Sequence, residues 1–80
     1  MEHSINYDTL YSMFLAKLKM AREDAGLTQV QVAEKLNKSQ SYVSKCENGD
    51  LKVDIVELMS FARIYKKPLD YFIADLGDSL

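Results

Sequence analysis

Apolar side chains recur every three or four positions along most of this chain, and that spacing restricts its fold more than any other feature. The first series is Tyr7, Tyr11, Phe14, Leu18, Ala21 and Ala25. Steps of three and four place side chains on one face of an α-helix. Later segments repeat this spacing, and we find no strand pattern. The sequence predicts an all-α fold.

Residues that begin and end helices separate the apolar series. Gly26 follows the first series, at the position of a left-handed C-terminal cap. Thr28 and Gln31 have the spacing of a capping box, so a short second helix begins there. Asn37 ends it, because asparagine tolerates the left-handed conformation better than most residues.

The segment "LNKSQSYVSKCENGD", residues 36–50, is polar enough to be taken for a loop. We interpret it instead as a third helix capped by Ser39, with Val43 and Cys46 pointing inward. Asn48-Gly49-Asp50 then forms a turn. The outward side of this helix is almost entirely polar.

Two further helices are expected. The fourth has Asp54 as its cap, and its predicted buried stripe is Ile55, Leu58, Met59, Ala62 and Tyr65. The fifth carries Pro68 in its first turn, and its predicted apolar face is Leu69, Phe72, Ile73 and Leu76. The chain is thus predicted to be one compact five-helix domain, residues 1–80, with a helix-turn-helix at about residues 28–47.

Composition limits the function. The chain has 80 residues, a net charge of -2, a pI of about 5.2 and a single cysteine. No apolar run approaches the roughly 20 residues of a membrane span, no secretory signal pattern begins the chain, and one cysteine suits a reducing cytoplasm. The acidic balance weighs mildly against nucleic acid. Residues 17–52 nevertheless carry seven basic and five acidic side chains, a local excess of +2.

The stretch "GLTQVQVAEKLNKSQSYVSKCENG" resembles the helix-turn-helix of Cro and phage repressors, also called XRE-like. The resemblance extends from about Phe14 to Leu76 and implies a lambda-repressor-like DNA-binding domain. The chain departs from the family pattern at several positions. The glycine usual before the last helix, for example, is replaced near Lys66-Lys67.

The resemblance implies roles for residues around the third helix. Arg22 corresponds to an arginine that pairs with a glutamate, here Glu47, and this pair would join the first helix to the third. Gln29 corresponds to a glutamine that contacts a phosphate and braces the third helix. Asn48 corresponds to a phosphate-contacting residue. The alternative for Arg22 and Glu47 is that both are ordinary surface charges.

The polar outer face of the third helix is then expected to read bases in the major groove. The candidate reading residues are Gln40, Ser41, Ser44 and Lys45, of which Gln40 suits adenine and Lys45 suits guanine. Tyr42, Lys35 and Lys38 are candidate phosphate contacts. The alternative is a solvated helix face without a ligand.

The fifth helix, about residues 68–76, offers more apolar side chains than one core-facing side needs. Tyr71, Ile73 and Leu76 are the candidate contacts of a homodimer. A two-fold dimer would place two reading helices roughly 34 Å apart and predicts a palindromic operator. RNA polymerase or a regulatory protein is a further candidate partner.

An enzyme is not expected, because His3 is the only histidine and Cys46 is predicted to be buried. Neither a metal site nor a cofactor is expected. We therefore expect a transcriptional regulator of the phage-repressor, Cro-like or restriction-modification controller type. The alternative is a protein-binding helix-turn-helix module, such as an antitoxin or antirepressor.

Overall fold

Helices account for most of the described chain, as the apolar spacing predicts. The computed structural model describes residues 6–78, with side chains described as far as Ala74. The helices are α1 (Tyr7–Asp24), α2 (Gln29–Leu36), α3 (Gln40–Asn48), α4 (Ile55–Tyr65) and α5 (Leu69–Asp78). No strand occurs within residues 6–78, so the all-α prediction is confirmed.

Local capping explains where the helices begin. Thr28 and Asp54 each accept a hydrogen bond from the backbone three residues on, at 3.1 and 2.7 Å, and Gln31 and Glu57 accept in return from the cap N–H groups. Ser39 caps α3 in the same way, without the return bond. Such caps satisfy backbone N–H groups that have no partner inside the helix.

Left-handed residues end three of the helices. Asn37 and Gly49 follow α2 and α3 with φ of 57° and 85°, and Lys66 follows α4 with φ of 58°. A Cβ atom at position 49 would also lie 3.0 Å from the side chain of Leu15, so glycine suits that position for two reasons. Pro68 immediately precedes α5 rather than lying within its first turn.

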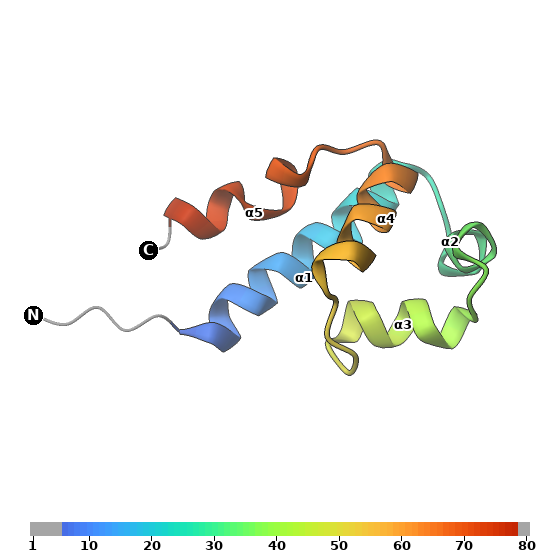
Figure 1. The fold of residues 1–80 in the computed structure, drawn as a ribbon, viewed down its shortest axis with the longest axis horizontal. Coiled ribbons are helices and arrows are strands. Elements are labelled where there is room, and N and C mark those ends of the chain that lie inside the picture. The colour runs from blue at the N-terminus through green and yellow to red at the C-terminus, as the bar shows by residue number, and fades with distance from the viewer. Residues whose placement is uncertain (1–5, 79–80) are drawn as a thin grey trace, which may run out of the picture.

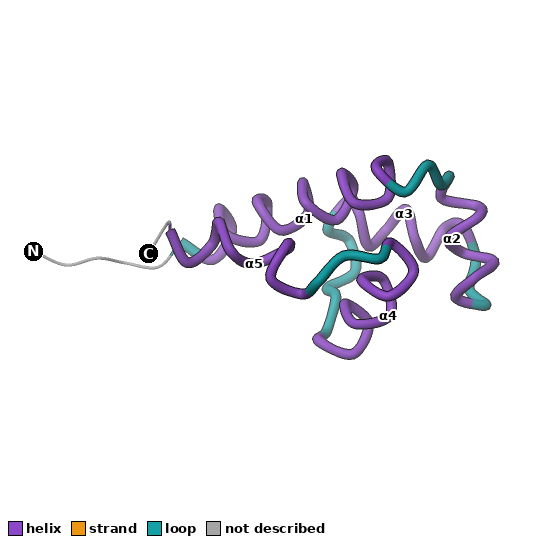
Figure 2. Tube along the Cα trace, turned by 90° about the horizontal axis from the view of Figure 1, so that it is seen from above, coloured by secondary structure: helices purple, strands orange, loops and turns teal. Residues whose placement is uncertain are grey.

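The longest helix, α1, runs through the centre of the fold (Figure 1). α5 lies along the N-terminal half of α1, and α2 and α3 lie toward its other end, as both views show (Figure 2). α4 covers the middle and contacts α1, α2 and α5. This arrangement leaves one long side of α3 unobstructed by any other helix.

The core lies between the helices, and each of the five contributes to it. Its residues are Phe14, Leu18, Ala21, Val32, Ala33, Val43, Cys46, Leu58, Phe61, Ala62, Tyr65 and Phe72. Val43 and Cys46 point inward from α3, as predicted.

The predicted buried stripe of α4 was partly wrong. Ile55 and Met59 are 63% and 52% exposed, while Phe61, which was not in the stripe, is fully buried. Apolar residues surround almost the whole of this helix, so spacing alone could not choose its buried face. On α5, Phe72 is buried as predicted, whereas Ile73 is 48% exposed.

Candidate nucleic-acid interface

The turn between α2 and α3 sets the direction of α3. Asn37 adopts the left-handed conformation, and the Lys38 N–H donates to the Ala33 carbonyl at 2.9 Å, which closes the end of α2. Ser39 then caps α3 through the Tyr42 N–H, at 3.1 Å. In Figure 1, α2 is seen almost end-on while α3 lies across the view, so the two helices cross steeply. This is the geometry of a helix-turn-helix.

The outward face of α3 is polar and accessible. Gln40, Ser41 and Lys45 are exposed, and Ser44 is half-buried. These residues follow the spacing of one helix side, opposite the buried Val43. The structure thus brings the four candidate reading residues together on one surface, and we call Gln40, Ser41, Ser44 and Lys45 the reading face.

An ion pair fastens the end of α3 to α1. Arg22 donates from Nε and Nη2 to the two carboxylate oxygens of Glu47, at 2.6 and 3.1 Å, and from Nη1 to the Leu27 carbonyl at 2.9 Å. The side chains are only 13% and 3% exposed. The hydrogen bond to Glu47 raises the pKa of Arg22, so the guanidinium remains charged. The pair is therefore part of the interior and not two surface charges.

Gln29 extends this pair to the first residue of the reading face. Its Nε2 donates to Glu47 at 3.0 Å, and its Oε1 accepts from Gln40 Nε2 at 2.6 Å. A bonded series therefore runs from Arg22 through Glu47 and Gln29 to Gln40. The contact between the two glutamines was not foreseen, because residues 29 and 40 become neighbours only through the turn.

Tyr42 does not lie as predicted. Its hydroxyl, the expected phosphate donor, donates to Glu57 at 2.7 Å. Burial, followed by the bond to Glu57, raises the pKa of Tyr42. The hydroxyl proton thus serves a bond between α3 and α4. The capping-box spacing of Asp54 and Glu57 predicts that Glu57 accepts a hydrogen bond from the Asp54 N–H. It does not predict the second hydrogen bond that Glu57 accepts, from Tyr42.

Three exposed lysines belong to the helix-turn-helix. Lys35 lies in the last turn of α2, and Lys38 lies in the turn, where its ammonium is 5.3 Å from the centre of the Tyr42 ring. Both are exposed, as is Lys45 on α3 itself. At the far end of α3, Asn48 is exposed and its amide lies 3.5 Å from the Ser44 hydroxyl. These positions suit contacts to a polyanion on both sides of α3.

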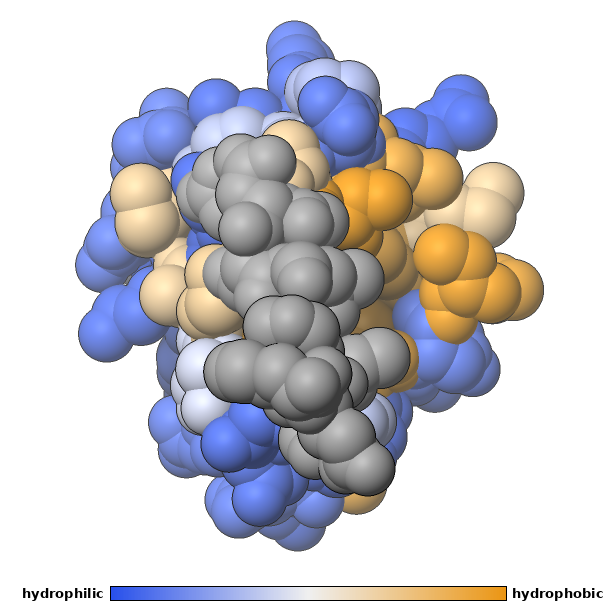
Figure 3. Space-filling model, turned by 90° about the vertical axis from the view of Figure 1, so that its left-hand side faces the viewer, coloured by the Kyte–Doolittle hydropathy of each residue, from blue (hydrophilic) through white to orange (hydrophobic). Residues whose placement is uncertain are grey.

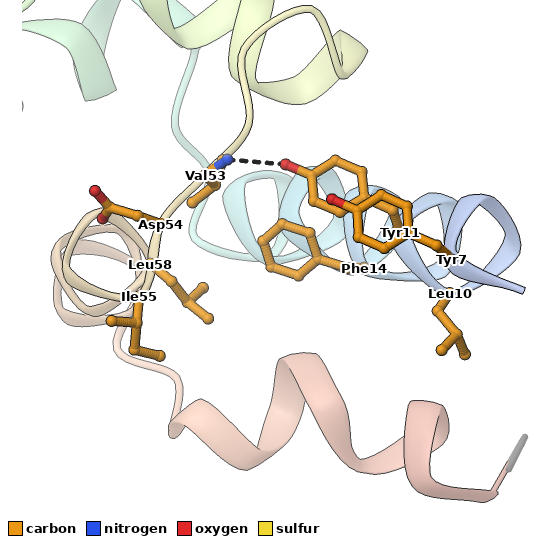
Figure 4. Close-up of a pocket in the computed structure, with 8 residues that line it drawn as sticks. All are labelled: Tyr7, Leu10, Tyr11, Phe14, Val53, Asp54, Ile55 and Leu58. Atoms are coloured by element: carbon orange, nitrogen blue, oxygen red, sulfur yellow. Dashed lines mark hydrogen bonds between the residues drawn. The ribbon is translucent and has the colours of Figure 1, made fainter. Parts of the chain in front are cut away.

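The loop after α3 is held by the start of α1. The Val53 N–H donates to the Tyr11 hydroxyl at 2.9 Å, shown as the dashed line in Figure 4. The Lys52 ammonium lies 4.2 Å from the centre of the Tyr11 ring. Beside this contact is a groove of about 330 Å³, lined by Tyr7, Leu10, Tyr11, Phe14, Val53, Asp54, Ile55 and Leu58. No pattern in the sequence predicts the bond between Tyr11 and Val53, because 42 positions separate the two residues.

The three candidate dimer residues differ in position. Tyr71 is half-buried, with its ring 5.1 Å from that of Phe72 and the Lys67 ammonium 4.5 Å from its centre. Ile73 is exposed. Leu76 lies outside the residues whose side chains are described. Of the two candidates whose side chains are described, Ile73 offers the exposed apolar surface expected of a dimer contact.

Two further features concern the part of the chain that the structure describes. No helix there is long and apolar enough to cross a membrane. No three histidine, cysteine, aspartate or glutamate side chains in it are grouped so that they could hold a metal ion.

Comparison with known proteins agrees with this geometry. The helix-turn-helix family model matches residues 18–72. The chain is also 33% identical over 60 residues to the HTH-type transcriptional regulator PrpR of Mycobacterium tuberculosis. That match covers 75% of this chain but 12% of the relative, so it concerns one segment of a much longer protein. Since the family model spans more than half of the chain and coincides with α2, the turn and α3, the chain belongs to the helix-turn-helix family.

Proposed function

We propose that this chain is a sequence-specific, double-stranded DNA-binding transcriptional regulator that acts in the cytoplasm. The observation that carries the proposal is the polar, accessible face of α3. Its first residue, Gln40, is held in one orientation by a hydrogen bond before any ligand binds. Gln40 is held by Gln29, which is itself held by Glu47. A side chain fixed before binding loses less conformational freedom when it meets a base. Family membership and the likeness to a named transcriptional regulator support the same reading.

Each group would have a distinct role in the complex. Gln40 and Lys45 would read adenine and guanine edges in the major groove, and Ser41 and Ser44 would contact bases or nearby phosphates. Gln29, Lys35, Lys38 and Asn48 would contact the phosphate backbone on either side of α3. Tyr42 would support α3 from behind through Glu57. Because the chain is acidic overall, DNA affinity would depend on these few local contacts and on low salt.

We further propose that the protein binds a palindromic operator as a homodimer. Two copies of α3 would occupy successive major grooves roughly 34 Å apart. Two half-sites would compensate for the modest number of positive charges on each copy.

The test begins with selection of binding sites from random duplex DNA, followed by titration of the selected site at two salt concentrations. Gln40→Ala and Lys45→Ala should each weaken operator binding by about 1–3 kcal/mol with an unchanged melting temperature. Lys66→Gly, which removes the same charge as Lys45→Ala but at the end of α4, is the control and should bind normally.

Operator affinity equal to wild type in both α3 variants would remove the reading face from this proposal. Failure to enrich any sequence, with only weak binding at low salt, would favour the alternative of a protein-binding helix-turn-helix module.

A further inference from the structure

The exposed side of α4 is unusually apolar for a surface helix. We define the α4 stripe as Ile55, Val56, Met59, Ser60 and Arg63, all exposed residues on consecutive turns. Ile55, Val56 and Met59 are 63%, 66% and 52% exposed, and so place large apolar side chains in water. Figure 3 shows hydrophobic residues gathered on the side of the molecule that faces the viewer in Figure 1, where α4 lies. Large apolar side chains gathered on one exposed side of a helix favour contact with another molecule.

A groove adjoins the stripe. It has a volume of about 470 Å³ between α4 and α5, and Val56, Met59 and Leu69 are among its lining residues. Ser60 lies in the middle of the stripe, and its hydroxyl donates to the Val56 carbonyl at 3.2 Å. Its side chain is thus small and already hydrogen-bonded within the helix. A second helix can approach closely here without leaving a polar group unsatisfied.

Charge identifies the partner. Asp54 stands exposed at the start of α4, and Arg63 stands exposed in its last turn, with the apolar residues between them. A helix with the same distribution of charge, laid antiparallel, would meet opposite charge at both ends. A two-fold arrangement of two copies gives each end its complement in this way, because both copies carry the same charges. The most direct source of such a helix is a second copy of this chain.

We propose that two copies associate through antiparallel α4 helices, with the two-fold axis passing close to Met59. Met59 then faces Met59 of the partner. Ile55 lies four residues before Met59, and Arg63 lies four residues after it. Ile55 of one copy therefore lies opposite Arg63 of the partner. Asp54 lies beside Arg63 of the partner on both sides of the axis. The proposal rests on the homodimer proposed above and assigns its contact to α4, with Leu69 and Ile73 of α5 at the edge.

The α4 stripe is separate from the reading face. Its residues lie on α4, whereas the residues proposed to read bases all lie on α3. The bond between Tyr42 and Glu57 joins the two helices from their inner sides. The two surfaces adjoin at the groove that Lys35, a proposed phosphate contact, lines together with Ser60 and Arg63 of the stripe.

The first experiment is sedimentation equilibrium of the full chain without DNA. Met59→Glu should raise the dimer dissociation constant about 100-fold or more, because two unpaired carboxylates would face each other at the centre of the contact. Met20→Glu is the matched control: Met20 is 47% exposed on α1, and this variant should dimerise within about threefold of wild type. Circular dichroism verifies that both variants fold.

Two further variants test the geometry. Arg63→Glu should weaken the dimer about tenfold at low salt and much less at high salt, because it places like charges opposite Asp54. Met59→Cys should form a disulfide-linked dimer under oxidised glutathione far faster than Met20→Cys, because only residues near the axis meet their own copy.

The inference and the proposed function can fail separately. A wild-type-like dimer in Met59→Glu overturns the α4 contact, even if the protein binds an operator. A monomer at every concentration overturns it too. Equal disulfide rates at positions 59 and 20 overturn the position of the axis, and a salt-independent effect of Arg63→Glu overturns the charge pairing. A dimer that Met59→Glu disrupts, without any DNA binding, supports the α4 contact and contradicts the proposed function.

Discussion

Removing Arg22 should cost far more than removing an ordinary surface charge. Arg22→Ala deletes three donated hydrogen bonds, two to Glu47 and one to the Leu27 carbonyl. It leaves the Glu47 carboxylate, 3% exposed, with Gln29 as its remaining hydrogen-bond donor. Breaking one side of a buried pair typically costs about 3–5 kcal/mol. Because Arg22 is itself 13% exposed and water can reach the site, we expect the lower end, about 3 kcal/mol.

This loss is large for a domain of this size. Total stability at roughly 0.05–0.15 kcal/mol per residue would be about 4–12 kcal/mol, so the variant would keep only part of it. At about 4–8 °C per kcal/mol, the melting temperature should fall by roughly 12–24 °C. Urea unfolding followed by circular dichroism at 222 nm measures the same change as a free energy.

Two comparisons isolate the buried pair. Arg22→Met with Glu47→Leu removes both charges and should recover much of the loss, because no unpaired buried carboxylate remains. Lys67→Ala breaks a 3.4 Å pair with Asp24, whose side chain is 57% exposed, and should cost less than about 1 kcal/mol. A cost of under about 1 kcal/mol for Arg22→Ala, or no recovery in the double variant, would refute this account of the pair.

Two other predictions concern stability. Lys66→Gly should stabilise the protein by about 0.5–1 kcal/mol, because Lys66 has φ of 58° and glycine adopts this conformation without steric cost. Asn37→Gly, at φ of 57°, should gain less, so equal gains in thermal unfolding would contradict the argument. The second prediction concerns pH. Burial raises the pKa of Cys46, Tyr42 and Tyr65, so the folded state holds these protons more tightly than the unfolded chain. The stability that these groups contribute is fully present below their ordinary pKa values, 9.0 for the thiol and 10.0 for the phenols. It is lost progressively as the pH rises from those values toward the higher pKa values of the folded state. The melting temperature should therefore fall from about pH 9 upward, less steeply in Tyr42→Phe; equal values at pH 8 and pH 10.5 would contradict it.

The sequence predicted the features that depend on neighbouring residues. Thr28 with Gln31 marked the start of α2, Asn37 marked its end, and Ser39 marked the start of α3. Each of these rests on contacts within a few positions, so spacing and side-chain chemistry are sufficient.

Features that depend on the relative placement of helices were harder to predict. Ile55 and Met59 were assigned to the core because apolar residues surround α4, and only packing against α1 and α2 selects which of them are buried. Tyr42 was expected to face a ligand, but Glu57 lies within reach of its hydroxyl once α4 folds back. The pair of Arg22 and Glu47 was anticipated through family resemblance, since 25 positions separate the two residues.

The hydrogen bond between Gln29 and Gln40 has a consequence for any attempt to redirect this domain to a new operator. Gln29 belongs to α2, yet its amide fixes which way the amide of Gln40 points. Replacing the outward residues of α3 alone would leave Gln29 oriented for a neighbour that is no longer present. If Gln40 reads a base as proposed, positions 29 and 40 would determine that contact together, and libraries of variants should randomise both positions.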